Sequence, residues 1–204
     1  NEIEHVLSID LSDEQIRMYA VLFQDSKIIE SNVLKTAESD TKNYSLLISI
    51  ERYKAALRID PNKIDRKITE IIMGLESLYL QNEKETLGYK LKYRIAQIAN
   101  LLDHNHDHDL NLKILALSYA IRSAFAHGSP KSDSTKKELA KLPKDFDITY
   151  YLLNLLRQSI LVFLFLTINK KELIALLDKS FVDDKSRSDL KKLILKSKLE
   201  FTKN

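Results

Sequence analysis

The 204-residue chain contains no cysteine, which excludes disulfides, cysteine-based zinc sites and thiol catalysis and fits a reducing cytoplasm. It has only three glycines and three prolines, so a β-sandwich or barrel rich in turns is disfavoured. A strong surplus of one charge is also lacking. The net charge of +3 is smaller than a dedicated DNA-binding domain carries, although it permits RNA binding through a local patch.

Long hydrophobic runs are scarce as well. The most apolar segment, 160–168, has nine residues, whereas a membrane span needs about 20. We therefore predict a buried core helix at this segment, no contact with a membrane and a cytoplasmic location. The first residue is not Met, and we expect the chain to be the C-terminal part of a longer protein.

Apolar residues recur at helical spacing along the chain, which predicts an all-α fold built as an up-and-down helical bundle with extra peripheral helices. The expected helices of the bundle cover 41–59, 64–79, 84–102, 110–127 and 147–168. The polar segment 131–144 predicts a loop or a short helix. We divide the chain into an N-terminal helical segment (1–40), the bundle (41–169) and one or two C-terminal amphipathic helices (170–204).

The helix predicted at 110–127 ends in a stretch with an arginine, a serine and a histidine among apolar residues, Tyr119-Ala-Ile-Arg-Ser-Ala-Phe-Ala-His-Gly128. Glycine after the last turn and proline soon beyond are the expected stop signal. At about 100° per residue the helix has two distinct faces. The predicted core face carries Ile114, Leu117, Ile121, Ala124 and Phe125, and the opposite face carries Tyr119, Arg122, Ser123 and His127.

Arg122 and His127 are residue types that RNA phosphodiester chemistry needs when no metal is present. A guanidinium stabilises a charged phosphate, and an imidazole moves a proton near neutral pH. The two residues are about 140° apart on an ideal helix, so two copies packed across a two-fold axis would be needed to converge them on one groove. The structural alternative is that Arg122 pairs with a carboxylate and His127 caps the helix.

Three further groups of residues are candidates for a role. Glu76 lies on a largely apolar helix face and needs a partner, for which we predict a structural ion pair with Arg94. Lys131 and the lysines after it can hold RNA phosphates beside His127, but the acids interleaved with them favour a solvated segment. His104, His106 and His108 are a possible Zn, Ni or Cu site, but we favour a solvated loop and expect no metal and no cofactor.

The motif and two upstream blocks resemble the HEPN domain superfamily, and most closely its Apea-like branch. Ile121-Arg-Ser-Ala-Phe-Ala-His-Gly128 is similar to the Arg-x4-6-His signature. Gly74-Leu-Glu-Ser-Leu-Tyr79 is similar to the Leu-Glu-x-Leu helix of that branch, and Tyr89-Lys-Leu-Lys-Tyr-Arg-Ile-Ala96 to its Arg-x-Ala helix. The resemblance covers roughly 49–166. Ser123 stands where many active members have Asn, Asp or His.

This resemblance implies a bundle that dimerises through its motif helices. Many such proteins are metal-independent ribonucleases in prokaryotic defence, toxin–antitoxin or stress systems, and others are non-catalytic modules for dimerisation, ligand sensing or assembly. It implies that Arg122 and His127 are catalytic and leave a 2′,3′-cyclic phosphate, with Tyr119 and Ser123 positioning the phosphate or bridging the dimer. The expected partners are RNA, a second copy, and an antitoxin or an N-terminal partner domain.

Overall fold

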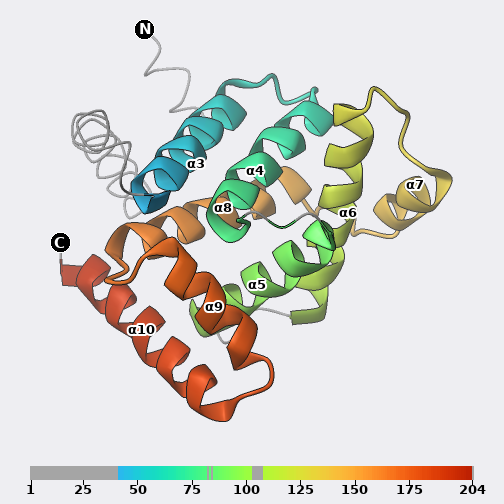
Figure 1. Ribbon diagram of the computed structural model, residues 1–204. Helices are drawn as coiled ribbons and strands as arrows, with labels where there is room; N and C mark the ends of the chain where they lie inside the picture. Colours follow the sequence, from blue (N-terminus) through green and yellow to red (C-terminus); the bar gives the residue numbers. More distant parts are fainter. Residues whose placement is uncertain (1–40, 82, 84, 103–107, 204) are drawn as a thin grey trace, which may run out of the picture.

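The computed structural model describes residues 41–81, 83, 85–102 and 108–203, and the regular structure among them is entirely helical (Figure 1). The helices are α3 (Thr41–Arg58), α4 (Ile64–Tyr79), α5 (Leu87–Leu102), α6 (His108–Ala126), α7 (Asp133–Ala140), α8 (Ile148–Phe165), α9 (Lys170–Ser180) and α10 (Asp184–Lys203). The predicted all-α bundle is confirmed. The predicted N-terminal helical segment lies outside the described residues.

The helix boundaries follow from local capping chemistry. Before α8, one carboxylate oxygen of Asp147 accepts hydrogen bonds from the backbone N–H groups of Thr149 and Tyr150, at 2.8 and 3.0 Å. Before α9, Asn169 and Glu172 form a capping box, in which each side chain accepts from the other residue's N–H. Both arrangements satisfy donors that have no partner inside a helix.

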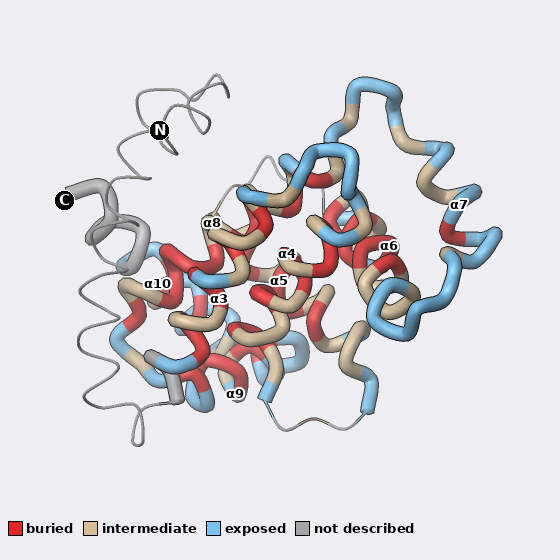
Figure 2. The backbone as a smooth tube through the Cα atoms, turned by 90° about the horizontal axis from the view of Figure 1, so that it is seen from above, coloured by how far each residue is buried: buried red, intermediate tan, exposed pale blue. Residues whose placement is uncertain are grey.

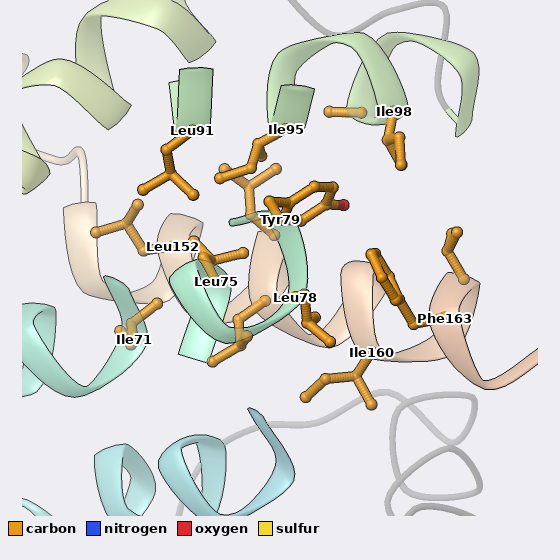
Figure 3. Close-up of a cluster of buried hydrophobic side chains, with 14 of the residues drawn as sticks. Ile71, Leu75, Leu78, Tyr79, Leu91, Ile95, Ile98, Leu152, Ile160 and Phe163 are labelled. Atoms are coloured by element: carbon orange, nitrogen blue, oxygen red, sulfur yellow. The ribbon is translucent and has the colours of Figure 1, made fainter. Parts of the chain in front are cut away.

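Helix α4 lies at the centre of the bundle and contacts α3, α5, α6, α8 and α9. Figure 3 shows its buried side chains meeting those of α5 and α8. Tyr79 is completely buried, packs edge-on against Phe163 with ring centroids 5.3 Å apart, and donates a hydrogen bond to Ser159 Oγ at 2.9 Å. The hydrogen bond satisfies the buried hydroxyl, so a polar atom is accommodated in the core.

Helix α8 is the core helix that segment 160–168 predicted. Its length and apolar composition match those of a membrane span, which is a property that core helices share. Ile160 and Phe163 are buried against the rest of the bundle (Figure 3). The prediction of a buried core helix is confirmed for 160–165, whereas the helix was expected to run to residue 168 and ends at Phe165.

The C-terminal helices α9 and α10 share the hydrophobic core of the bundle. Leu173, Leu177 and Leu190 have no exposed surface and belong to the same buried cluster as the residues of α4 and α8. The predicted border after residue 169 coincides with the turn between α8 and α9, and the core continues across it. By contrast, α7 is a peripheral and largely exposed helix (Figure 2).

Candidate active site

The motif lies on the last two turns of α6, beside α4. Ile114, Leu117 and Ile121 are buried, as the helical spacing predicted. Phe125 was predicted to face the core, and this is wrong, because 48% of its surface is exposed. Ile121 is the last buried residue of α6, so the final turn extends beyond the packed part of the bundle.

The end of α6 is built by a Schellman motif. The N–H of Ser129 donates to the carbonyl of Ala124 at 2.9 Å, and the N–H of Gly128 donates to that of Phe125 at 3.1 Å. Gly128 has φ +64°, a left-handed conformation that a residue with a Cβ adopts at a cost. His127 occupies the C-cap position and is exposed. Gly128 therefore fixes where the imidazole emerges from the bundle.

Arg122 turns toward α4 and forms an ion pair with Glu76. Its Nη2 lies 2.8 Å from Oε2 of Glu76, and 27% of the arginine side chain and 16% of the glutamate side chain are exposed. Burial raises the pKa of Glu76, and the charge of Arg122 together with its hydrogen bond opposes that rise. The guanidinium is thus held in one direction by a carboxylate from another helix.

The predicted pairing of Glu76 with Arg94 is wrong. Arg94 binds Asp178 through two hydrogen bonds of 2.8 and 2.7 Å and also binds Glu83 and the carbonyl of Tyr79, each at 2.7 Å. Arg94 therefore faces the end of α4 and α9, whereas Glu76 faces α6. Asp178 is 84 residues from Arg94 in the sequence, and no local sequence pattern predicts that contact.

Tyr119 lies one turn before Arg122, with its ring against the start of α5. A Cβ placed on Gly88 would come within 2.8 Å of that ring, so only glycine leaves room for it there. Partial burial raises the pKa of Tyr119; the negative charge of Glu76 raises it further and Arg122 opposes both. Tyr119, Arg122 and Glu76 therefore form one cluster at the junction of α4, α5 and α6. The role of Gly88 was missed, although glycine inside a helix of a glycine-poor chain is a usable signal.

Ser123 and His127 are neighbours on the helix, since the N–H of His127 donates to the carbonyl of Ser123 at 3.1 Å. Ser123 is partly buried, and His127 is exposed. The surroundings of His127 differ from those of Arg122, which is bound to α4. Within one copy of the chain, the imidazole is therefore exposed to solvent, whereas the guanidinium is held against α4.

The predicted phosphate-binding residue Lys131 forms an ion pair with Asp65 in the first turn of α4, at 2.7 Å. Two later lysines of the same segment also have carboxylate partners: Lys136 with Asp133, and Lys141 with Glu138. The Lys136–Asp133 pair is largely exposed, whereas the Lys131–Asp65 pair is partly buried, with 30% and 37% of the side chains exposed. Such pairs are weak, and they tie Lys131 to α4 without removing its charge from the surface.

Two of the three loop histidines, His104 and His106, lie outside the described residues. His108 opens α6, and its Nδ1 is 2.6 Å from Nδ2 of Asn100. In the described parts of the chain, no group of three or more His, Asp or Glu side chains is arranged to hold a metal ion.

Comparison with known proteins gives no relative: no family model, no curated protein and no solved structure matches the chain. The structure itself shows an all-α bundle. Its candidate site is the cluster of Tyr119, Arg122 and Glu76, where α6 meets α4 and α5.

Proposed function

We propose that the chain is a metal-independent endoribonuclease of the HEPN type, which cleaves single-stranded RNA as a homodimer. The observation that carries the proposal is a contrast between two arginines. Arg94 is 1% exposed and donates four hydrogen bonds, as a structural arginine does. Arg122 is 27% exposed and donates one to Glu76, while its buried Nε has no partner among the described residues. Arg122 is therefore incompletely satisfied, and the exposed part of its guanidinium can bind a phosphate.

The reaction would be an intramolecular transesterification. The 2′-oxygen of the ribose attacks the adjacent phosphorus and its proton leaves to a base, while the bond from phosphorus to the 5′-oxygen breaks and that oxygen receives a proton. His127 would carry one of these proton transfers, and Arg122 would stabilise the negative charge that builds on the phosphate oxygens. The products are a 2′,3′-cyclic phosphate and a 5′-hydroxyl.

Glu76 would act as a positioning residue. Its carboxylate holds Nη2 of Arg122, which directs the guanidinium and leaves its exposed part for a phosphate. Tyr119 packs against Gly88 next to this pair, where its hydroxyl can bind or orient the same phosphate. Ser123 and Lys131 are the remaining candidates for binding.

A second copy of the chain would complete the site. Arg122 is directed to α4 and His127 protrudes at the end of α6, so packing two α6 helices across a two-fold axis is the simplest way to converge both groups on one groove. Phe125 and Ala126 are exposed on the same final turn and can supply the apolar contact. We place this activity in prokaryotic antiviral defence or stress response in the cytoplasm, under an antitoxin or an N-terminal partner domain.

The test is cleavage of a fluorescently labelled single-stranded RNA in EDTA. Wild-type protein is expected to cleave it, and Arg122→Ala and His127→Ala are each expected to lower the rate at least about 100-fold, in the range of one general acid–base contribution. His108→Ala at the opposite end of α6 and Arg66→Ala on α4 are the matched controls and should retain the rate. Unchanged cleavage in both motif variants, or none by the wild type, would overturn the proposal.

The pair of Glu76 and Arg122 also supports a second candidate function, a non-catalytic HEPN module for dimerisation, ligand sensing or assembly within a larger defence protein. A guanidinium that is already neutralised by a partly buried carboxylate is typical of a structural ion pair. This candidate predicts a stable dimer with no RNA cleavage. Light scattering together with the cleavage assay separates the two functions.

A further inference from the structure

A row of aromatic side chains lies on the surface where α5 meets the end of α9, two helices that are in contact in the fold (Figure 1). We define the aromatic row as Tyr89, Tyr93 and Phe181. The ring centroids of Tyr89 and Tyr93 are 4.4 Å apart, and those of Tyr93 and Phe181 are 6.1 Å apart with perpendicular planes. Tyr89 is 60% exposed and Phe181 43%, so both keep much of their ring surface in solvent.

Polar contacts beneath the aromatic row hold it in place. Asp178, three residues before Phe181, is bound twice by Arg94 of α5, at 2.8 and 2.7 Å. Ser180 accepts a further hydrogen bond from the side-chain amide of Gln97, also on α5. The end of α9 is therefore fixed against α5, and the rings are arranged before any partner arrives.

A cation accompanies the rings. Nζ of Lys92 lies 5.6 Å from the centroid of the Tyr89 ring and 5.2 Å from that of Tyr93. Of the acids nearest in sequence to Phe181, Asp178 and Asp184 are paired with Arg94 and Arg187, whereas Asp183 accepts hydrogen bonds from the neutral Ser186 and keeps its charge. Lys92 thus supplies positive charge beside an exposed aromatic surface.

The aromatic row begins next to the candidate active site. Tyr89 directly follows Gly88, against which the ring of Tyr119 packs, and Tyr119 lies one turn before Arg122 on α6. Gly88 and Tyr89 thus connect the candidate active site to the aromatic row along α5. This continuity favours an extended polymer over a compact ligand.

We propose that the aromatic row stacks unpaired bases of single-stranded RNA, while Lys92 binds a phosphate between them, and that it extends the substrate path from Arg122. Exposed π-faces accept any base, and a nearby cation matches the sugar–phosphate backbone, which is the combination that single-strand binding surfaces use. The inference rests on the proposed function for the identity of the polymer. It assigns a binding role to residues that lie outside the catalytic motif.

The experiment measures binding in the absence of cleavage. Full-length His127→Ala protein is titrated into fluorescein-labelled oligouridine and into a ribose-phosphate oligomer of equal length without bases, and anisotropy is recorded. Adding Tyr89→Ala or Phe181→Ala is expected to weaken oligouridine binding about tenfold. Tyr89→Phe, which keeps the ring, should bind as tightly as the parent. Tyr44→Ala, which removes an exposed tyrosine of α3, is the matched control.

Lys92→Gln tests the phosphate contact separately. It should lower the slope of log affinity against log salt by about 0.7, the value for one phosphate of a single strand. Affinity for the oligomer without bases should be lower throughout and insensitive to Tyr89→Ala. Thermal melts check that each variant is folded.

Oligouridine affinity that is unchanged in both Tyr89→Ala and Phe181→Ala overturns the inference, as does preferential binding of a proline-rich peptide that both substitutions abolish. The result is separable from that of the cleavage assay. Loss of oligouridine binding in the Tyr89→Ala and Phe181→Ala variants supports the proposed RNA-binding role of the aromatic row even if the wild type cleaves no RNA. If the wild type cleaves RNA and both variants bind oligouridine normally, only the proposed role of the aromatic row is overturned.

Discussion

At the scale of single residues, Glu76 couples stability to the candidate active site. Burial of its carboxylate raises its pKa, which means that the charged form is disfavoured in the folded state. Arg122 offsets this by its charge and its hydrogen bond of 2.8 Å. A substitution of Arg122 that tests its proposed catalytic role therefore also changes the free energy of folding.

Arg122→Ala is expected to destabilise the protein at neutral pH by about 1–3 kcal/mol, because Glu76 is left as a partly buried and unpaired charge. Without the arginine, the pKa of Glu76 rises further in the folded state. The folded protein then binds more protons than the unfolded chain, so the deficit is present at neutral pH and shrinks as pH falls toward the unfolded pKa of about 4.3. Urea unfolding at several pH values measures this dependence.

The double variant Glu76→Gln/Arg122→Ala is the control for this prediction. Removing the charge of residue 76 should recover most of the lost stability near neutral pH. An equal loss for Arg122→Ala at acidic and neutral pH would show that the ion pair contributes nothing to stability.

Lys170 is a buried amine whose nearest hydrogen-bond partners carry no charge. Its Nζ donates to the carbonyl of Ser77 at 2.6 Å and to Oγ of Ser45 at 3.2 Å, and only 9% of the residue is exposed. Burial lowers its pKa to about 8, aided by the positive charge of Arg94 and opposed by Glu83. Keeping this amine charged therefore destabilises the folded state.

Stability should rise with pH between about 8 and 10.4, the pKa of a solvated lysine, because the unfolded chain binds more protons in that interval. Below pH 8 the amine is charged in both states and the cost is fully present. Lys170→Met should remove this rise and stabilise the protein near neutral pH, on the order of 1–3 kcal/mol. Urea unfolding of both proteins over this pH range measures it.

The neighbouring Lys171 is exposed and gives a matched control. Lys171→Met should keep the slope of the wild type. If Lys170→Met also keeps that slope, other groups cause the pH dependence and the assignment to Lys170 is wrong.

At the scale of secondary-structure elements, two cations cap the C-terminal end of α4, although α4 has no basic residue in its own last turn. Arg94 donates to the carbonyl of Tyr79 and Lys170 to that of Ser77. Carbonyls at a helix end lack partners within the helix and favour positive charge. Because Arg94 comes from α5, Lys170 from α9, and Asp178 of α9 binds Arg94, this contact joins three helices.

Arg94→Met should destabilise the protein by about 3 kcal/mol or more, since it removes the cationic partner of the partly buried Glu83, a cap of α4 and a link between helices. Asp178→Asn should cost only about 1 kcal/mol, because the Asp178 side chain is 47% exposed. Urea unfolding gives both values. Arg187→Met, which removes the largely exposed pair with Asp184 and one hydrogen bond of 3.2 Å to the carbonyl of Ser180, is the control and should cost no more than about 1 kcal/mol.

The order of these effects is the decisive part of the prediction. A loss for Arg94→Met no larger than that for Arg187→Met would contradict the structural role of Arg94. It would also weaken the contrast with Arg122, on which the proposed function depends.

The sequence predicted the helices well where local chemistry ends them. The helix expected at 110–127 covers His108–Ala126, because Gly128 is suited to the left-handed residue that terminates it. Side-chain partners were predicted less well. Glu76 was assigned to Arg94 because the two lie on consecutive helices, whereas its partner Arg122 is 46 residues away on a helix packed alongside. Helical periodicity predicts which face of a helix is buried, but it does not predict which of the other helices packs against that face.

At the scale of the whole molecule, the proposed function makes the end of α6 half of a site that a second copy would complete. Arg122 is anchored to α4, while His127 and Phe125 protrude on the turn of α6 that leaves the bundle. A symmetric pairing of two α6 ends would bury Phe125 and bring the imidazole of one copy near the guanidinium of the other. Dimerisation would then be a condition for activity.

Mixing two inactive proteins tests whether the site is shared between copies. If each catalytic pair in the shared groove uses Arg122 of one copy and His127 of the other, a heterodimer of Arg122→Ala and His127→Ala contains one intact pair out of two. Equal mixing makes about half of the dimers mixed, so cleavage should return to about a quarter of the wild-type rate. The measurement is RNA cleavage in EDTA after denaturing and refolding the two variants together. Phe125→Asp in both chains should abolish the recovery by blocking the dimer, which light scattering verifies, whereas no recovery from dimeric mixtures would place both catalytic groups within one copy.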